Sequence, residues 1–117
     1  MSKFFLMFTI ILLFVFISCE DTVFGTSTWK YEITGTATSV RITMNNRNEE
    51  TIQQTVDVPW STTFERDNIY TFFAYISAQN QSRSGNVTVK IYRNDKVVDN
   101  ASTSVEFGIA TASYYYN

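Results

Sequence analysis

The segment NVTVKIYRNDKVVD, residues 86–99, has the pattern of a β-hairpin. Its first half alternates valine or isoleucine with polar or amphipathic side chains, which is the period of two of a half-buried strand. Asn94 and Asp95 separate this half from a second run of strand-forming residues. Both residue types tolerate the left-handed backbone of a two-residue hairpin turn. We therefore predict two antiparallel strands joined at Asn94 and Asp95.

The same alternation recurs on both sides of this hairpin. Runs rich in β-branched and aromatic residues are separated by polar turns, and Pro59 ends one run because proline cannot donate to a sheet ladder. The most apolar run, residues 69–78, is the predicted central strand. Asn100 to Ser104 interrupts the pattern before a last strand. The predicted strands cover residues 29–34, 40–44, 49–58, 60–64, 69–78, 87–93, 96–99 and 105–116.

No run in the chain beyond the N-terminal segment has the period of a helix. Seven or eight short strands, repeating about every 8–12 residues with turn signals between them, are typical of an antiparallel β-sandwich. The sequence therefore predicts an all-β fold, an antiparallel sandwich of seven or eight strands.

The N-terminus carries an apolar run from Phe4 to Ile17, preceded by Lys3 and interrupted only by Thr9. A helix that spans a bilayer needs about 20 apolar residues, whereas the apolar region of a secretory signal needs about 7–15. The run therefore predicts a cleaved signal peptide over residues 1–18.

The end of this run, Ile17-Ser18-Cys19, resembles the lipobox of bacterial lipoproteins. In that motif a cysteine after a small residue is lipidated and becomes the new N-terminus. Phe16 departs from the aliphatic residue usual at its position. We expect a lipid anchor on Cys19, with residues 19–28 as lipidated cysteine and tether and residues 29–117 as the sandwich domain. The alternative is a free thiol beside an uncleaved signal anchor.

An acidic pair, Glu20-Asp21, follows the cysteine. It resembles the surface-export signal of lipoproteins in Bacteroidota, or it forms a solvated linker. Attached acyl chains would hold the domain on a membrane, since each buried CH₂ contributes about 0.8 kcal/mol. We expect a location in the bacterial cell envelope, on the outer membrane, either periplasmic or surface-exposed.

The charge balance argues against nucleic acid as a partner. The chain has nine basic and eleven acidic residues; loss of residues 1–18 removes Lys3 and leaves eight basic residues, eleven acids and a net charge of −3 on 99 residues. A nucleic-acid-binding domain needs a basic face. With Cys19 lipidated, no cysteine remains for a disulfide, so we expect packing alone to stabilise the single domain.

We predict no catalytic residue, metal site or cofactor. Histidine, the commonest general base and transition-metal ligand, is absent. The acids fall mostly in predicted turns, no serine stands in a Gly-x-Ser-x-Gly motif, and no Asp-x-Asp-x-Asp-Gly loop is present for calcium. The protein is therefore not expected to be an enzyme.

Two aromatic features are candidate contacts with a partner or ligand. Trp60 is in phase with Phe64, so its ring lies either in the core between the sheets or on the surface as an anchor for a partner. Tyr114, Tyr115 and Tyr116 either form the last strand, with Tyr115 facing opposite to its neighbours, or provide an aromatic platform for a sugar or a partner strand.

Several short motifs together resemble the extracytoplasmic domain of mycobacterial MmpS-type transport accessory proteins. The motifs span most of residues 29–98 and fall on Tyr31, Glu32, Gly35, Pro59, Trp60, Ser61, Ala78, Gln79 and Val87 to Val98. The chain departs from that family in three features. The family's paired cysteines correspond to Val89 and to residues near Thr111 to Ser113, and its hairpin glycine corresponds to Asp95 or Lys96. Cys19 stands in place of the family's transmembrane anchor. The resemblance implies an immunoglobulin-like sandwich and an accessory role beside a lipid or siderophore exporter.

The sequence thus predicts a non-catalytic, lipid-anchored binding module of the envelope, whose partner is an envelope transporter, another envelope protein or an envelope ligand. The alternative is a small carrier that holds a lipid or siderophore in a cavity between the sheets. A cavity would favour the carrier, and an apolar surface patch would favour the binding module.

Overall fold

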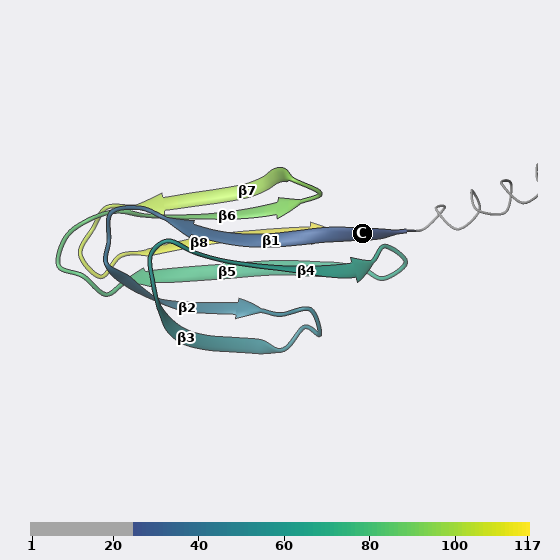
Figure 1. Ribbon diagram of the computed structural model, residues 1–117, viewed down its shortest axis with the longest axis horizontal. Helices are drawn as coiled ribbons and strands as arrows, with labels where there is room; N and C mark the ends of the chain where they lie inside the picture. The colour runs from purple at the N-terminus through teal and green to yellow at the C-terminus, as the bar shows by residue number, and fades with distance from the viewer. Residues whose placement is uncertain (1–24) are drawn as a thin grey trace, which may run out of the picture.

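The computed structural model describes residues 25–117, which form eight antiparallel strands in two packed sheets (Figure 1). Sheet A has the strand order β4-β1-β6-β7, and sheet B has the order β3-β2-β5-β8. The all-β antiparallel sandwich expected from the alternation is confirmed; its immunoglobulin-like character remains a prediction. The strands are β1 (Thr26–Thr34), β2 (Ser39–Asn45), β3 (Thr51–Asp57), β4 (Trp60–Asp67), β5 (Phe72–Asn80), β6 (Val87–Arg93), β7 (Lys96–Thr103) and β8 (Ile109–Tyr116).

The predictions for the signal peptide, for Cys19 and for most of the tether lie outside the described residues. Among residues 25–117, no helix is long and apolar enough to cross a bilayer. The first strand begins at Thr26, three residues earlier than the alternation predicts, because Thr26 to Thr28 pair with the end of β4 and the buried Ser27 bonds the side chain of Asn68.

The loops gather at two ends of the sandwich. At the N-terminal end lie the start of β1, the turns at residues 46–50, 68–71 and 94–95, and the C-terminus (Figure 1). The opposite end carries the loops at residues 35–38, 58–59, 81–86 and 104–108. Both ends of the described chain therefore lie at the same end of the molecule.

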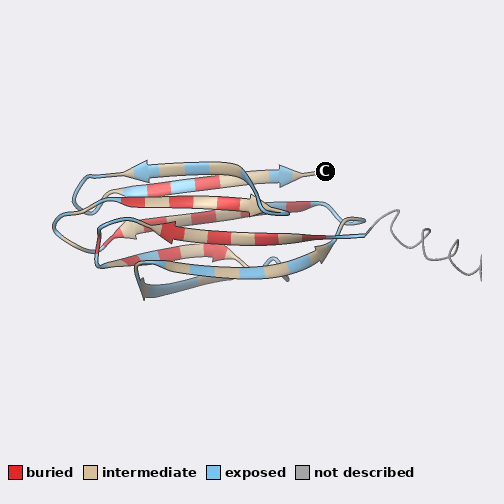
Figure 2. Ribbon diagram, turned by 45° about the horizontal axis from the view of Figure 1, so that its top comes forward, coloured by how far each residue is buried: buried red, intermediate tan, exposed pale blue. Residues whose placement is uncertain are grey.

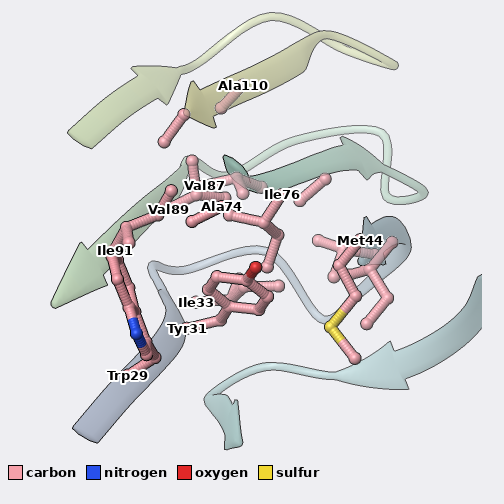
Figure 3. Packing of buried hydrophobic residues seen from close by; sticks show 14 of the residues in the cluster. Trp29, Tyr31, Ile33, Met44, Ala74, Ile76, Val87, Val89, Ile91 and Ala110 are labelled. Carbon is pink, nitrogen blue, oxygen red and sulfur yellow. The ribbon is translucent and has the colours of Figure 1, made fainter. Parts of the chain in front are cut away.

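Alternate residues of the strands fill the space between the sheets (Figure 2). Trp29, Tyr31 and Ile33 of β1 lie in the middle of this core, beside the buried residues of β5 and β6 (Figure 3). The Trp29 ring is 1% exposed, and its centroid lies 5.1 Å from that of Phe72. The strong period-two pattern of these strands is thus explained, because one face of each strand packs inward.

The predicted hairpin in residues 86–99 is confirmed. Asn94 and Asp95 both have positive φ angles, 50° and 67°, as a two-residue turn of the primed type requires. The backbone N–H of Asn94 donates to the carbonyl of Thr28 at 2.8 Å, which holds the turn against β1. A bulge between Ile91 and Tyr92 shifts the register of the β6–β7 pair.

Strand boundaries besides the start of β1 were also predicted wrongly, and β4 continues past Phe64 to Asp67 because it pairs with β1. β5 begins at Phe72 rather than Ile69, because Ile69 and Tyr70 lie exposed in the turn after β4. β7 continues through Asn100 to Thr103, since its backbone pairs with β6 although its side chains are small and polar. The apolar residues from Val105 onward do not start β8, because the chain turns there and the N–H of Gly108 donates to the carbonyl of Val105.

β5 occupies an inner position in sheet B, between β2 and β8, as expected of the most apolar run. β3 ends at Asp57 and β4 begins at Trp60, so Pro59 lies between two strands as predicted. β4 is an edge strand of sheet A. Its inward residues, Trp60 and Phe64, are only partly buried at the margin of the core.

Candidate functional site

The outer face of sheet B carries an exposed aromatic patch at the N-terminal end. Phe73 and Tyr115 occupy directly opposite positions of β5 and β8, and their side chains are 47% and 58% exposed. Tyr75, two residues further along β5, is half-buried; its ring centroid lies 6.4 Å from that of Phe73 at an interplanar angle of 24°. We call Phe73, Tyr75 and Tyr115 the aromatic platform.

These three side chains share a face because residues two apart in a strand point the same way, and directly paired residues lie side by side. The other phase of the same strands supplies the core: Phe72 and Ala74 of β5 are buried, and Tyr114 and Tyr116 of β8 pack against it. The core is therefore complete without the platform, and packing does not require its aromatic rings.

A hollow of about 330 Å³ adjoins the platform. Phe73 and Tyr75 form one side of it, and the end of β2 with the start of β3 forms the other. Its lining residues are Thr43, Met44, Asn45, Glu49, Thr51, Phe73 and Tyr75.

A residue of the opposite sheet fixes the backbone beneath the platform. The backbone pairing of β2 with β5 ends at Met44 and Ile76. Beyond this point, side chains rather than the β2 backbone bond the backbone of β5. The Tyr75 N–H donates to the Tyr31 hydroxyl at 3.2 Å and to Asn45 Oδ1 at 3.0 Å. The Tyr31 hydroxyl donates to Asn45 Oδ1 at 2.5 Å, and Asn45 Nδ2 donates to the Phe73 carbonyl.

Burial raises the pKa of the Tyr31 phenol far above its ordinary value. Tyr31 is therefore protonated at neutral pH and remains a hydrogen-bond donor. Its hydroxyl and the Asn45 amide together hold the β5 backbone at two consecutive platform positions. The backbone that carries the Phe73 and Tyr75 rings is thus preorganised for ligand binding.

The surface beside the platform is polar and uncharged. The next row across sheet B places Gln53, Thr43, Ser77 and Thr111 side by side, and Gln53 Nε2 donates to Thr43 Oγ1 at 3.3 Å. Among the outward side chains of the four strands of sheet B, only Arg41 and Asp57 are charged, and both lie toward the opposite end of the sandwich. The carboxylate of Glu49, at the rim of the hollow, lies 3.3 Å from Arg66.

The residues predicted as contacts are distributed over two places. Tyr115 belongs to the platform and faces opposite to Tyr114 and Tyr116, whose rings lie 6.1 and 6.3 Å from that of Trp29. Trp60 lies in sheet A, at the opposite end of the sandwich from the platform. It is partly buried beside a surface hollow of about 180 Å³. The structure therefore does not bring Trp60 and the tyrosines into one site.

Sequence reasoning missed Phe73 and Tyr75. The run TFFAYISA is apolar in both phases, so nothing in it marks which aromatic residues face outward. A strand with one buried face needs apolar residues only at every second position. The run has aromatic residues at both sets of positions, and this excess is the signal that could have pointed to Phe73 and Tyr75.

Other features of the described residues are less suited to a ligand. A hollow of about 230 Å³ at the N-terminal end is lined by Arg47, Arg66, Glu65 and Asp67 among others, so its charges balance. Within residues 25–117, no cluster of three or more acidic, cysteine or histidine side chains could hold a metal ion. Large side chains fill the space between the sheets.

No protein-family model and no curated protein sequence matches this chain. What the aromatic platform can do follows from its own chemistry.

Proposed function

We propose that the protein is a non-catalytic binding module of a bacterial cell envelope, held at a membrane by lipid on Cys19, and that it binds through the aromatic platform. The observation that carries this proposal is the direct pairing of two exposed aromatic side chains, Phe73 and Tyr115, on a complete sandwich. Aromatic side chains bury large areas on contact and dominate binding energies.

The position of the platform also supports binding. An aromatic patch exposed on a folded domain typically marks an interaction site. Phe73 and Tyr75 stand on β5 and Tyr115 on the neighbouring β8, and these two strands are paired along the platform, so the platform is supported by strands rather than by a loop. A rigid support reduces the entropy lost when a ligand binds.

The groups around the platform support binding rather than catalysis. They are aromatic rings, hydroxyls and amides, and the one carboxylate of the adjoining hollow, that of Glu49, is paired with Arg66. General acid–base catalysis needs a proton-transferring group placed beside the substrate. The accessory role implied by the MmpS-type resemblance is also that of a non-catalytic module and is compatible with this proposal.

The anchor is tested by metabolic labelling with a palmitate analogue. Wild-type protein should incorporate the label, and Cys19→Ala should not, because the cysteine thiol carries the acyl chain. Equal labelling of the two proteins would refute the lipid anchor.

The platform is tested by reconstituting the full-length protein in fluorescent phospholipid vesicles and measuring their capture on immobilised envelopes of the source bacterium. Empty vesicles give the background. The double variant Phe73→Ala/Tyr115→Ala should reduce capture at least tenfold. Tyr70→Ala is the matched control, because Tyr70 is 61% exposed but lies in the turn between β4 and β5, outside the platform. Equal capture by the double variant and the wild type would refute the platform as the binding site.

A further inference from the structure

The shape and polarity of the platform together restrict the chemical class of its ligand. Phe73 and Tyr75 stand side by side with nearly parallel rings on a sheet surface, and Tyr115 extends the apolar area across to β8. Together the three rings form an apolar surface across two paired strands.

Beside the rings, the sheet offers hydrogen-bonding groups of both kinds. Gln53 supplies an amide, and Thr43 and Ser77 supply hydroxyls; each can donate and accept. A ligand that matches this surface has an apolar face bordered by groups that both donate and accept. A pyranose ring has this arrangement, with C–H bonds on its faces and hydroxyls around its rim.

The charge of the surface restricts the ligand further. The outward side chains of β5 and β8 include no charged residue, and Glu49 at the rim of the hollow is paired with Arg66. An anionic ligand would normally be met by arginine or lysine. The uncharged surface therefore fits a neutral ligand.

The size of the patch disfavours a protein as occupant. A stable protein–protein interface buries about 800 Å² on each partner and centres on a desolvated apolar core. The platform consists of three side chains, and its next row is polar. It fits a small polar ligand better than a protein surface.

The length of the tether restricts where the ligand lies. Six residue steps separate Cys19 from Gly25, and an extended chain covers at most about 3.6 Å per residue, so Gly25 stays within about 22 Å of a lipid on Cys19. Phe73 and Tyr115 lie at the same end of the sandwich as Gly25. A lipid on Cys19 therefore keeps the end of the sandwich that carries the platform close to the membrane.

We infer that the aromatic platform binds a neutral saccharide chain of the cell envelope, close to the membrane that carries the protein. This inference rests on the proposed function and names the ligand class of the same site. The sugar rings stack on Phe73, Tyr75 and Tyr115, and their hydroxyls bond the amide and hydroxyl groups of the neighbouring row.

The vesicle-capture assay tests this inference when the envelopes are pretreated. Periodate cleaves sugars that contain vicinal diols, and lysozyme cleaves the peptidoglycan chains that resist periodate. Capture of vesicles with wild-type protein should fall at least tenfold after the two treatments in succession, and mock-treated envelopes are the control. Platform-dependent capture that survives both treatments overturns the inference. If that same capture is lost after proteinase K alone, the occupant is a protein, and the proposed function stands without the saccharide.

Two further measurements test the chemistry of recognition. Binding to a neutral ligand should change less than twofold between 50 and 500 mM NaCl, whereas a tenfold loss over this range would show an ionic contact and overturn neutrality.

Tyr115→Phe keeps the ring and should retain capture within about threefold, while Tyr115→Ala should lose most of it. Equal losses for the two variants would overturn ring stacking as the mode of binding.

Discussion

The hydroxyl oxygen of Tyr31, a residue of sheet A, accepts a hydrogen bond from the backbone N–H of Tyr75 in sheet B. The bond joins the two sheets through the core at the point where β2 and β5 stop pairing. A buried backbone N–H without a partner is costly. The Tyr31 hydroxyl provides the Tyr75 N–H with an acceptor, as the carbonyl groups of the neighbouring strand do elsewhere in the sheet. The same residue also contributes its ring to the core.

Removal of this hydroxyl should weaken the domain moderately. Tyr31→Phe keeps the ring and leaves Asn45 Oδ1 as a partner for the Tyr75 N–H, so we expect the free energy of unfolding to fall by about 0.5–1.5 kcal/mol. Urea unfolding of the purified protein at pH 7 measures it. Tyr92→Phe is the control, since the Tyr92 hydroxyl bonds Glu32 on the outer surface and its loss should cost less than about 0.5 kcal/mol. A larger loss for Tyr92→Phe would contradict this role of Tyr31.

The same phenol predicts a loss of stability in alkaline solution. Burial raises the pKa of Tyr31 in the folded state above the value of about 10 in the unfolded chain, so the fold favours the neutral form. This contribution is fully present below pH 10 and is lost as the pH rises above it. The hydrogen bond to Glu32 also raises the pKa of Tyr92, which acts in the same direction at a more exposed site.

We therefore expect the free energy of unfolding to fall between pH 9.5 and 11.5, and the fall to be smaller in Tyr31→Phe. Urea unfolding at several pH values across this range provides the measurement. Curves of the same slope for the variant and the wild type would show that Tyr31 does not control the alkaline transition.

The two tryptophans should differ in their effect on stability. Trp29 is fully buried among Phe72, Tyr114 and Tyr116, so Trp29→Ala should cost about 3–5 kcal/mol. Trp60 is partly buried on an edge strand, so Trp60→Ala should cost roughly half as much. Chemical denaturation of both variants gives the comparison. If Trp29→Ala is too unstable to purify, Trp29→Phe and Trp60→Phe replace the pair, and a greater loss for the Trp60 variant would contradict the assignment.

The hairpin should tolerate glycine at Asp95, in the turn, but not at Lys96, in the following strand. Asp95 has a left-handed backbone, which costs an L-residue about 1–2 kcal/mol, while glycine loses about 0.5–1 kcal/mol more entropy on folding. Asp95→Gly should therefore raise the free energy of unfolding by about 0.5 kcal/mol. Lys96→Gly, one residue later in β7, should lower it by about 0.5–1 kcal/mol. Thermal unfolding of the two variants provides the test. A higher melting temperature for Lys96→Gly than for Asp95→Gly would contradict the assigned turn.

The sequence predicts best those strands that have one buried and one polar face. β1, β2 and β6 were recognised because inward apolar residues alternate with outward polar ones, and the Asn94-Asp95 turn has its own signal. The end of β7 was missed because backbone pairing with β6 holds it, and no apolar side chain records that pairing. The turn at Ile69 and Tyr70 was missed for the opposite reason, since apolar residues lie exposed in it.

The candidate site was only half visible in the sequence. The outward direction of Tyr115 follows from counting residues along a strand, and the structure confirms this direction. That Phe73 lies opposite Tyr115 depends on the pairing of β5 with β8, which are separated by nearly thirty residues of chain. No local pattern encodes the register between two such distant strands, because it arises from the packing of the entire sandwich.

The position of β1 has a mechanical consequence. β1 lies inside sheet A and pairs with β4 on one side and β6 on the other, and the chain enters it at Gly25. Ladder bonds run perpendicular to the strands, so a pull along β1 from its start loads many of these bonds together in shear. An edge strand pulled from its end at right angles would instead peel away one bond at a time. A force on the tether that acts along the axis of β1 therefore meets the sheet in its mechanically strongest direction.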